Sequence, residues 1–185
     1  MIYDSYAWKR ELRLKKNQLI KHNSKSAFDK NFDLAYHKVE SAILYSAFII
    51  RKLIESEKLS TVADAHSLSA KNYLPIKRID RLHHWCDEDC YDWEKSGSQT
   101  MTGKNICNQL IHSYVMQLLF EEDAAVIGFF VSSDYDRNKG LFEVSLEDWI
   151  QYMDLIISDS VVAQEMHFDE NKDDYRITKK ERGQF

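Results

Sequence analysis

The sequence has little proline and little glycine. It contains one proline, Pro75, and five glycines in 185 residues. Both residues are unfavourable inside helices, because proline lacks a backbone donor and glycine loses the most backbone entropy on folding. Their scarcity predicts long helices joined by few tight turns.

Cysteine is also scarce, and neither a signal segment nor a membrane span is evident. The three cysteines are an odd number, which argues against a disulfide framework. The amino-terminal residues lack the apolar core of a secretory signal. No apolar run reaches the roughly 20 residues that cross a bilayer. We therefore expect a cytoplasmic protein in a reducing environment, without membrane association.

Four common catalytic and nucleotide-binding motifs are missing. The sequence contains no G-x-x-x-x-G-K-[ST] loop, no G-x-G-x-x-G fingerprint, no H-E-x-x-H and no G-x-S-x-G. P-loop nucleotide hydrolysis, Rossmann chemistry, zinc proteolysis and α/β-hydrolase chemistry therefore lose their usual support. We expect no cofactor.

The net charge of −5 does not suggest a general polyanion binder, but the charge is uneven along the chain. Residues 1–25 hold seven Lys and Arg against two acids, for +5, which leaves −10 on the remainder. A basic amino-terminal helix of this kind binds nucleic acid, anionic lipid or an acidic partner, or docks on its own acidic body. The candidate binding residues are Lys9, Arg10, Arg13, Lys15 and Lys16.

The apolar spacing predicts a mostly α fold, a helical bundle with a β-hairpin inserted before the last main helix. The composition of residues 124–133 is that of a buried strand, and Gly140 suits the turn that follows. We expect a single helical domain over 1–163. Its elements are a basic helix over 6–22, core helices over 33–58 and 102–121, a hairpin over 124–145 and a helix over 146–163, with a short helix near 79–91 and a charged, frayed tail over 164–185.

The sixteen residues from Asn105 to Phe120 carry no formal charge, in a chain where 30% of residues are charged. At 100° per residue one arc is apolar, and the other holds Asn108, His112 and further amide or hydroxyl side chains. A face turned to bulk water usually carries charges, whereas neutral polar groups cost less to bury. The pattern therefore predicts a face shielded from solvent. It is either a core face with satisfied hydrogen bonds or a site in which Asn108 orients the imidazole of His112.

The segment from Cys107 to His112 resembles the R-N-x-x-x-H signature of the HEPN superfamily, with cysteine in the arginine position. This resemblance implies an all-α protein, often a homodimer, from toxin–antitoxin or phage-defence systems. In active members, which are metal-independent ribonucleases, the arginine and histidine of two subunits meet in a dimer cleft. Asn108 and His112 carry over from the signature, and the catalytic arginine does not. Arg51, at the end of the preceding apolar helix, is an alternative source of positive charge.

Three functions follow from these observations. The leading hypothesis is a non-catalytic HEPN-like module that binds RNA or a partner protein, because Cys107 cannot stabilise a charged phosphorane. The second is a ribonuclease in which His112 works with a non-standard cationic partner. The third is a purely structural adaptor.

A short segment also combines possible metal ligands. His83, Cys86 and Cys90 stand three and seven residues apart, so they share one face if the segment is helical. The spacing is not that of a usual zinc knuckle, and no second pair completes a tetrahedron. We therefore predict an amphipathic segment with Trp85 inward, and no metal site.

Overall fold

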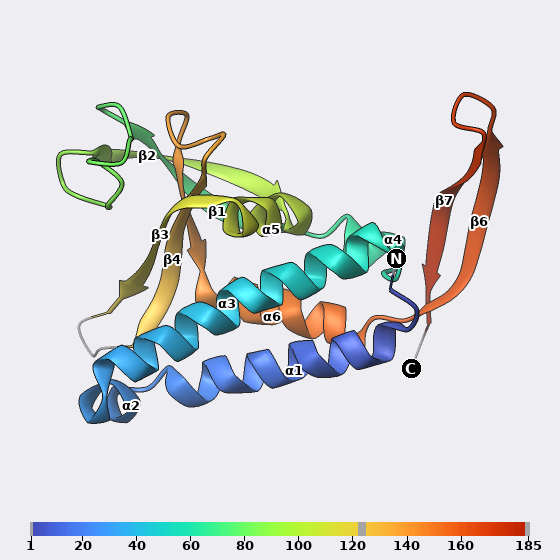
Figure 1. Ribbon diagram of the computed structural model, residues 1–185, viewed down its shortest axis with the longest axis horizontal. Helices are drawn as coiled ribbons and strands as arrows, with labels where there is room; N and C mark the ends of the chain where they lie inside the picture. The colour runs from blue at the N-terminus through green and yellow to red at the C-terminus, as the bar shows by residue number, and fades with distance from the viewer. Residues whose placement is uncertain (1, 122–124, 184–185) are drawn as a thin grey trace.

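The structure, a computed structural model, describes residues 2–121 and 125–183. The chain is mixed α/β, with 41% of residues in helices and 35% in strands. A five-stranded antiparallel sheet and a separate two-stranded sheet accompany the helices (Figure 1). The prediction of a mostly α bundle, and the all-α fold that the HEPN resemblance implies, are therefore wrong.

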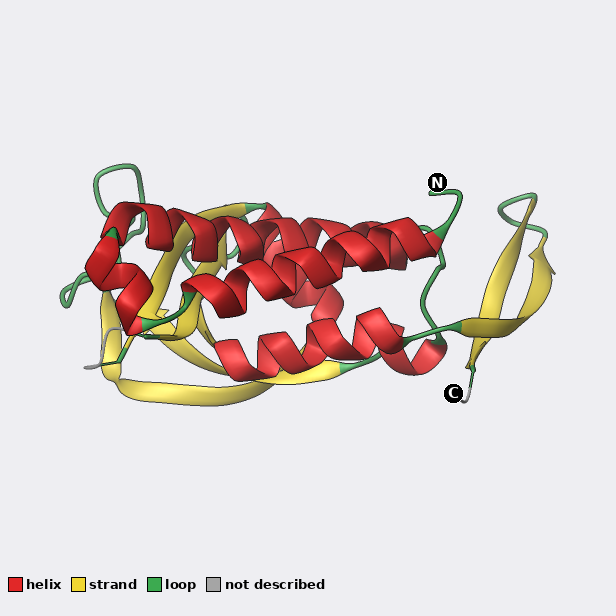
Figure 2. Cartoon of the chain, turned by 90° about the horizontal axis from the view of Figure 1, so that it is seen from below, coloured by secondary structure: helices red, strands yellow, loops and turns green. Residues whose placement is uncertain are grey.

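The helical part consists of two long helices and four shorter ones. They are α1 (Ser5–His22), α2 (Lys25–Lys30), α3 (Phe32–Glu55), α4 (Thr61–Asp64), α5 (Gly103–Ile111) and α6 (Leu146–Ser158). Side chains cap their first turns: Asp4 accepts from Tyr6, and Asn31 accepts from Leu34. The long helices α1 and α3 lie side by side, as both views show (Figures 1 and 2).

The main sheet has the strand order β2-β1-β5-β4-β3, and every neighbouring pair is antiparallel. Its strands are β1 (Ser67–Pro75), β2 (Tyr91–Thr102), β3 (Ser113–Phe120), β4 (Val126–Ser133) and β5 (Leu141–Ser145). Helices α5 and α6 pack on β4, and together with α1 and α3 they enclose the larger core cluster. A smaller apolar cluster around Tyr91 and Phe130 forms under residues 76–90.

The helix predicted over 102–121 is wrong in its second half. The helix α5 ends at Ile111, and the chain continues as the strand β3, which pairs with β4 from Ser113 opposite Ser133. The residues 113–120 are uncharged and rich in aromatic and branched side chains, so they suit a buried strand as well as a buried helix. The segment is a strand because it pairs with β4. The spacing of apolar residues within the segment carries no information about that pairing.

The hairpin predicted over 124–145 corresponds to β4 and β5, which are paired from Gly128 opposite Ser145. Its first predicted residue, 124, lies outside the described residues. Strands β1 and β2 have no counterpart among the predicted elements, because nine of their 21 residues are exposed and seven of those nine are polar. The short helix predicted near 79–91 does not form. An isolated bridge between Asp80 and His83 and a series of turns occupy that stretch instead.

The carboxyl-terminal segment is a β-ribbon where a frayed tail was predicted. The helix α6 ends at Ser158, before the predicted limit of 163. Strands β6 (Val161–Asp169) and β7 (Asp174–Arg182) then pair with each other alone. This ribbon projects beyond the end of the helices (Figure 2). Residues 184–185 of the predicted tail lie outside the described residues.

Candidate functional site

An open pocket of about 630 Å³ lies where α5 meets α3 and the ends of β2 and β4. We call it the Arg51 pocket. Asn108 and His112, the two residues singled out from the sequence, both line it, and so does Arg51 from α3. Further hydrogen-bonding side chains come from Gln99, Thr100, Asn105, Gln109, Tyr135 and Asp136.

The backbone of His112 is held firmly while its ring stays open to solvent. The residue caps the carboxyl end of α5: its N–H donates to the Asn108 carbonyl at 3.1 Å, and its own carbonyl accepts from Asp134 at 3.0 Å. The side chains of His112 and Asn105 are exposed, and Asn108 is half-buried. The predicted shielding of this helix face therefore does not extend to His112, which is available to a ligand.

Gln109 is the buried polar residue of α5, and its side chain links this helix to Ser133 and Asp136 on the opposite side of the pocket. Its Oε1 accepts from the backbone N–H of Ser133 at 2.7 Å, and its Nε2 donates to Asp136 Oδ2 at 2.7 Å. Burial alone would raise the pKa of the Asp136 carboxyl, but hydrogen bonds from Gln109, Lys139 and Ser133 hold it below its ordinary value. The sequence interpretation placed Gln109 on the polar arc but assigned it no role, since its partners lie 24 and 27 residues further along the chain.

Arg51 supplies the pocket with a guanidinium group. Its Nε pairs with Glu55 Oε1 at 3.0 Å, one turn along α3. Its Nη1 is buried and has no hydrogen-bond partner within the part of the chain that the structure describes. Cys107, which stands in the arginine position of the HEPN signature, is fully buried in the main core, and burial raises the pKa of its thiol although the Arg51 charge acts in the opposite direction. The positive charge near the Asn108–His112 pair therefore comes from α3.

The basic residues of α1 divide into two groups. Three of the five candidates serve the fold. Lys9 is buried and donates to the Asp159 carbonyl at 2.5 Å, with burial lowering its pKa against the nearby Asp159 charge. Lys15 and Lys16 form ion pairs with Glu11 at 3.5 Å and Asp154 at 2.6 Å.

The other two candidates, Arg10 and Arg13, have exposed side chains. They line a second open pocket, of about 660 Å³, between the start of α1 and the start of β6. Lys58 also lines it. Fewer basic side chains of α1 are therefore available to an anion than its composition suggests.

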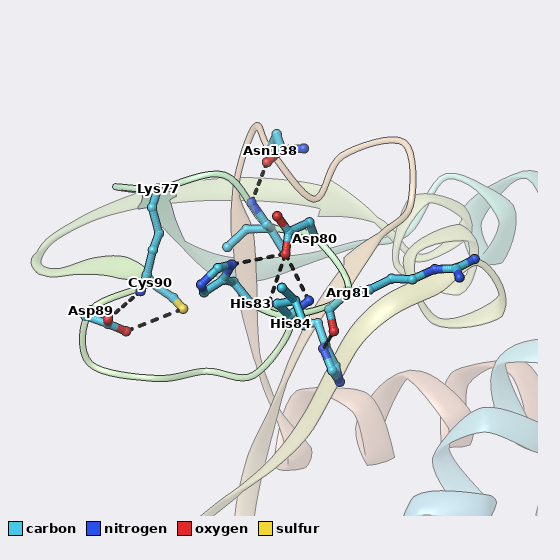
Figure 3. A network of polar contacts seen from close by, with 10 residues as sticks. Lys77, Asp80, Arg81, His83, His84, Asp89, Cys90 and Asn138 are labelled. Carbon is cyan, nitrogen blue, oxygen red and sulfur yellow. Dashed lines mark hydrogen bonds and ion pairs between the residues drawn. The ribbon is translucent and has the colours of Figure 1, made fainter.

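Two of the three residues considered for metal binding, His83 and Cys90, make local polar contacts (Figure 3). His83 Nδ1 lies 3.0 Å from Asp80 Oδ1, and burial raises the pKa of the Cys86 thiol to about 12, with Asp87 and Cys90 contributing. Among the described residues, one group places three possible ligand atoms within 4.8 Å of one another. It consists of Asp87, Asp89 and Cys90.

That group includes Cys90 but neither His83 nor Cys86. Lys77 already donates to Asp89, so one of the three possible ligands is engaged by a cation (Figure 3). Burial also raises the pKa of the Cys90 thiol, which disfavours the thiolate that a metal requires. These contacts give the segment a structural role in covering the smaller apolar cluster.

Comparison with known proteins adds no assignment. No protein-family model, no curated protein and no solved structure matches the chain. Within residues 2–121 and 125–183, no helix has the length and apolar character needed to cross a membrane. The residues that line the Arg51 pocket are therefore the observations that bear on function.

Proposed function

We propose that this protein binds single-stranded RNA, and that the Arg51 pocket holds one phosphate of the strand and the nucleotide attached to it. The observation that supports this proposal is the convergence of Arg51, Asn108 and His112, from two helices, on one open pocket. The HEPN resemblance of the Asn108–His112 segment adds support for RNA as the ligand, and a defence or toxin–antitoxin setting is proposed from that resemblance alone.

The chemistry of the lining suits one phosphate and one base. A guanidinium group presents paired donors that match phosphate oxygens, and Arg51 lines the pocket. The amides of Asn105 and Asn108 can hydrogen-bond base edges and a 2′-hydroxyl. Tyr135 is 82% exposed and provides a ring on which a base can stack.

The charges in the pocket favour RNA binding without RNA cleavage. Arg51 is already paired with Glu55, so only part of its charge is available to a phosphorane. A ribonuclease is the second candidate, because His112 has an exposed ring beside Arg51 in the same pocket. In that case His112 would take the proton of the 2′-hydroxyl, since Asp136, with its lowered pKa, is a weak base.

The proposal is tested by fluorescence anisotropy with a labelled single-stranded RNA and a DNA of the same sequence. Arg51→Gln should weaken RNA binding about 10- to 100-fold, the value of a charge-assisted hydrogen bond of about 1.5–3 kcal/mol. The matched control is Arg78→Gln, because Arg78 is exposed and does not line the pocket. Equal affinities for the two variants, or no RNA binding by the wild type, would overturn the proposal and favour a structural adaptor.

A gel assay on the same RNA separates the two candidates. Cleavage by the wild type that is lost in His112→Ala, with RNA binding retained, would establish the ribonuclease. Intact RNA after prolonged incubation would support the binding module. The proposal also includes a cytoplasmic location, from the sequence, and a homodimeric state, from the HEPN resemblance.

A further inference from the structure

The helix α1 carries a basic stripe that is separate from the Arg51 pocket. The stripe consists of Tyr6, Lys9, Arg10 and Arg13. At 100° per residue these four side chains lie within about 100° of the helix circumference, and the buried residue Leu12 lies outside that arc. All four line the open pocket of about 660 Å³ between the start of α1 and the start of β6, which we call the Arg10 pocket.

Three cations of the Arg10 pocket make no ion pair with any other residue that the structure describes. They are Arg10 and Arg13 from α1, and Lys58, which follows α3. Both arginine side chains are exposed, and Lys58 is half-buried. Lys16 of the same helix, in contrast, is paired with Asp154 at 2.6 Å. The three positive charges are therefore available to a ligand.

The acids that line the same pocket are engaged elsewhere. Asp4 caps the first turn of α1, where the positive end of the helix dipole offsets its charge. Glu57 accepts from Lys180 at 2.5 Å. Asp159 accepts from the N–H and the hydroxyl of Ser60, at 2.7 and 2.6 Å. The lining therefore keeps an excess of positive charge.

Hydrogen bonds between distant segments hold the walls of the pocket in place. The buried amine of Lys9 donates to the Asp159 carbonyl at 2.5 Å, which ties α1 to the turn before β6. Gln164 Nε2 donates to the Glu57 carbonyl at 3.4 Å, which ties β6 to the end of α3. The start of α1 and the base of the ribbon lie at the same end of the molecule (Figure 1). The pocket is therefore formed before a ligand arrives, as most small-molecule sites are.

The number of cations indicates which anion fits. Guanidinium groups present paired N–H donors that match phosphate oxygens, and lysine binds phosphate as a point charge. One phosphate group carries about −1.5 to −2 at neutral pH, so three cations exceed the charge of one phosphate and suit two. The volume of about 660 Å³ lies within the range of small-molecule pockets, about 300–1,000 Å³.

We infer that the Arg10 pocket binds the diphosphate group of a small molecule, with both arginines on the phosphate oxygens and Lys58 completing the charge. Tyr6 lies one turn before Arg10 on the same face of α1, and its side chain is 71% exposed. A planar group attached to the diphosphate can stack on this ring. The diphosphate has two possible sources, inorganic pyrophosphate and a nucleoside diphosphate, and Tyr6 distinguishes them.

The test is isothermal titration calorimetry of the full chain with pyrophosphate, adenosine diphosphate and adenosine. The wild type should bind the first two and not adenosine. Replacing both Arg10 and Arg13 by Gln should weaken pyrophosphate binding about 100-fold, because each charge-assisted hydrogen bond contributes about ten-fold or more. No binding of pyrophosphate at about 1 mM, binding of adenosine as tight as that of its diphosphate, or equal affinities of wild type and double variant would overturn the inference.

The matched control is Lys21→Gln, because Lys21 is an exposed cation of the same helix that does not line the pocket. It stands eight residues beyond Arg13, about 12 Å along the helix, and charges are screened over about 8 Å at physiological salt. The affinity of this variant for pyrophosphate should change by less than about two-fold. A loss as large as that of the double variant would show that net charge, and not the pocket, attracts the anion. Equal melting temperatures of the variants and the wild type establish that the fold is intact.

The source of the diphosphate is identified by a further variant. With a nucleoside diphosphate as the source, adenosine diphosphate binds more tightly than pyrophosphate, and Tyr6→Ala weakens its binding about ten-fold, the value of one stacked base. Pyrophosphate binding stays unchanged in this variant. Equal affinities of the wild type for the two ligands assign the inorganic source.

This inference goes beyond RNA binding, since the Arg10 and Arg51 pockets share no lining residue in the part of the chain that the structure describes. Saturating pyrophosphate should therefore leave the labelled RNA bound, when compared with sodium chloride of the same ionic strength. Displacement of the RNA would show that both ligands use one surface, and would overturn the assignment of a separate site. Failure of the RNA proposal leaves the calorimetry unaffected, so the two proposals fail separately.

Discussion

The hydrogen bonds of Gln109 give the most direct test of how the Arg51 pocket is built. Replacing Gln109 by Leu keeps the size of the side chain and removes both bonds. The lost bond to Ser133 is worth about 1 kcal/mol, and the lost bond to the Asp136 carboxylate about 1.5–3 kcal/mol. The Ser133 N–H is buried and would be left without a partner, at a further cost of about 1–3 kcal/mol. Allowing for some overlap and relaxation, we expect a loss of about 3–5 kcal/mol at neutral pH.

Urea unfolding followed by tryptophan fluorescence measures this loss. With a slope of about 2 kcal/mol per molar urea, the midpoint should fall by about 1.5–2.5 M. The control is Asn105→Leu, a substitution at an exposed position of the same helix, which should change stability by less than about 0.5 kcal/mol. A decrease in the free energy of unfolding of less than about 1 kcal/mol for Gln109→Leu would show that the two hydrogen bonds of Gln109 do not stabilise the fold.

The pH dependence gives an independent check of the same bond. The pKa of Asp136 is lowered in the folded chain, so this group stabilises the fold above its unfolded pKa of about 3.9, and that contribution disappears as the pH falls through the folded value. Without Gln109 the pKa of Asp136 rises towards its ordinary value. The stability gap between wild type and Gln109→Leu should therefore narrow between pH 7 and about 3. A gap that stays constant over this range would contradict the assignment of the bond.

Three further predictions concern the framework around the site. Gly103→Ala places a Cβ 2.2 Å from the ring of Tyr152, and overpacking of this kind should cost about 2–3 kcal/mol in urea unfolding. Asp159→Ala removes the buried acceptor of the Ser60 N–H and hydroxyl, at 2.7 and 2.6 Å, and should lower the melting temperature by about 10 °C in calorimetry. Lys180→Met removes the ion pairs at the base of the ribbon, so amide exchange should accelerate in β6 and β7 while the main core stays protected. Burial lowers the pKa of Lys180, but its two carboxylate partners raise it above 10.5 overall, so the ion pairs should hold the base of the wild-type ribbon from neutral pH up to that value.

The helices were the part of the fold that local pattern could predict. The predicted helices over 6–22 and 33–58 lie close to α1 and α3, because their apolar residues recur at helical spacing and polar caps precede them. The strands β1 and β2 were not predicted, because their sequences lack such a local pattern of apolar residues. Their exposed residues are mostly Ser, Thr, Lys and Glu, and they are held by pairing with each other across up to 35 residues and, for β1, with β5 across about 70 residues.

The candidate site was predicted in part. The sequence singled out Asn108 and His112 and offered Arg51 as an alternative source of positive charge, and all three residues line the Arg51 pocket. The role of Gln109 could not be predicted, since amide side chains have the same local signature whether their partners are protein or water. The availability of the basic residues was also overestimated, because Lys9 and Lys16 meet acceptors about 140 to 150 residues away.

The sequence by itself indicated which segments are apolar enough to be buried and where α1 and α3 begin, and it singled out Asn108 and His112 of the α5 region as candidate site residues. The tertiary structure decided whether 113–120 is helix or strand, whether the charged tail pairs with itself, and which cation stands beside His112. The physical reason is the same in each case. Burial and capping depend on neighbours a few residues away, whereas strand pairing and side-chain partners depend on contacts between segments that are distant along the chain.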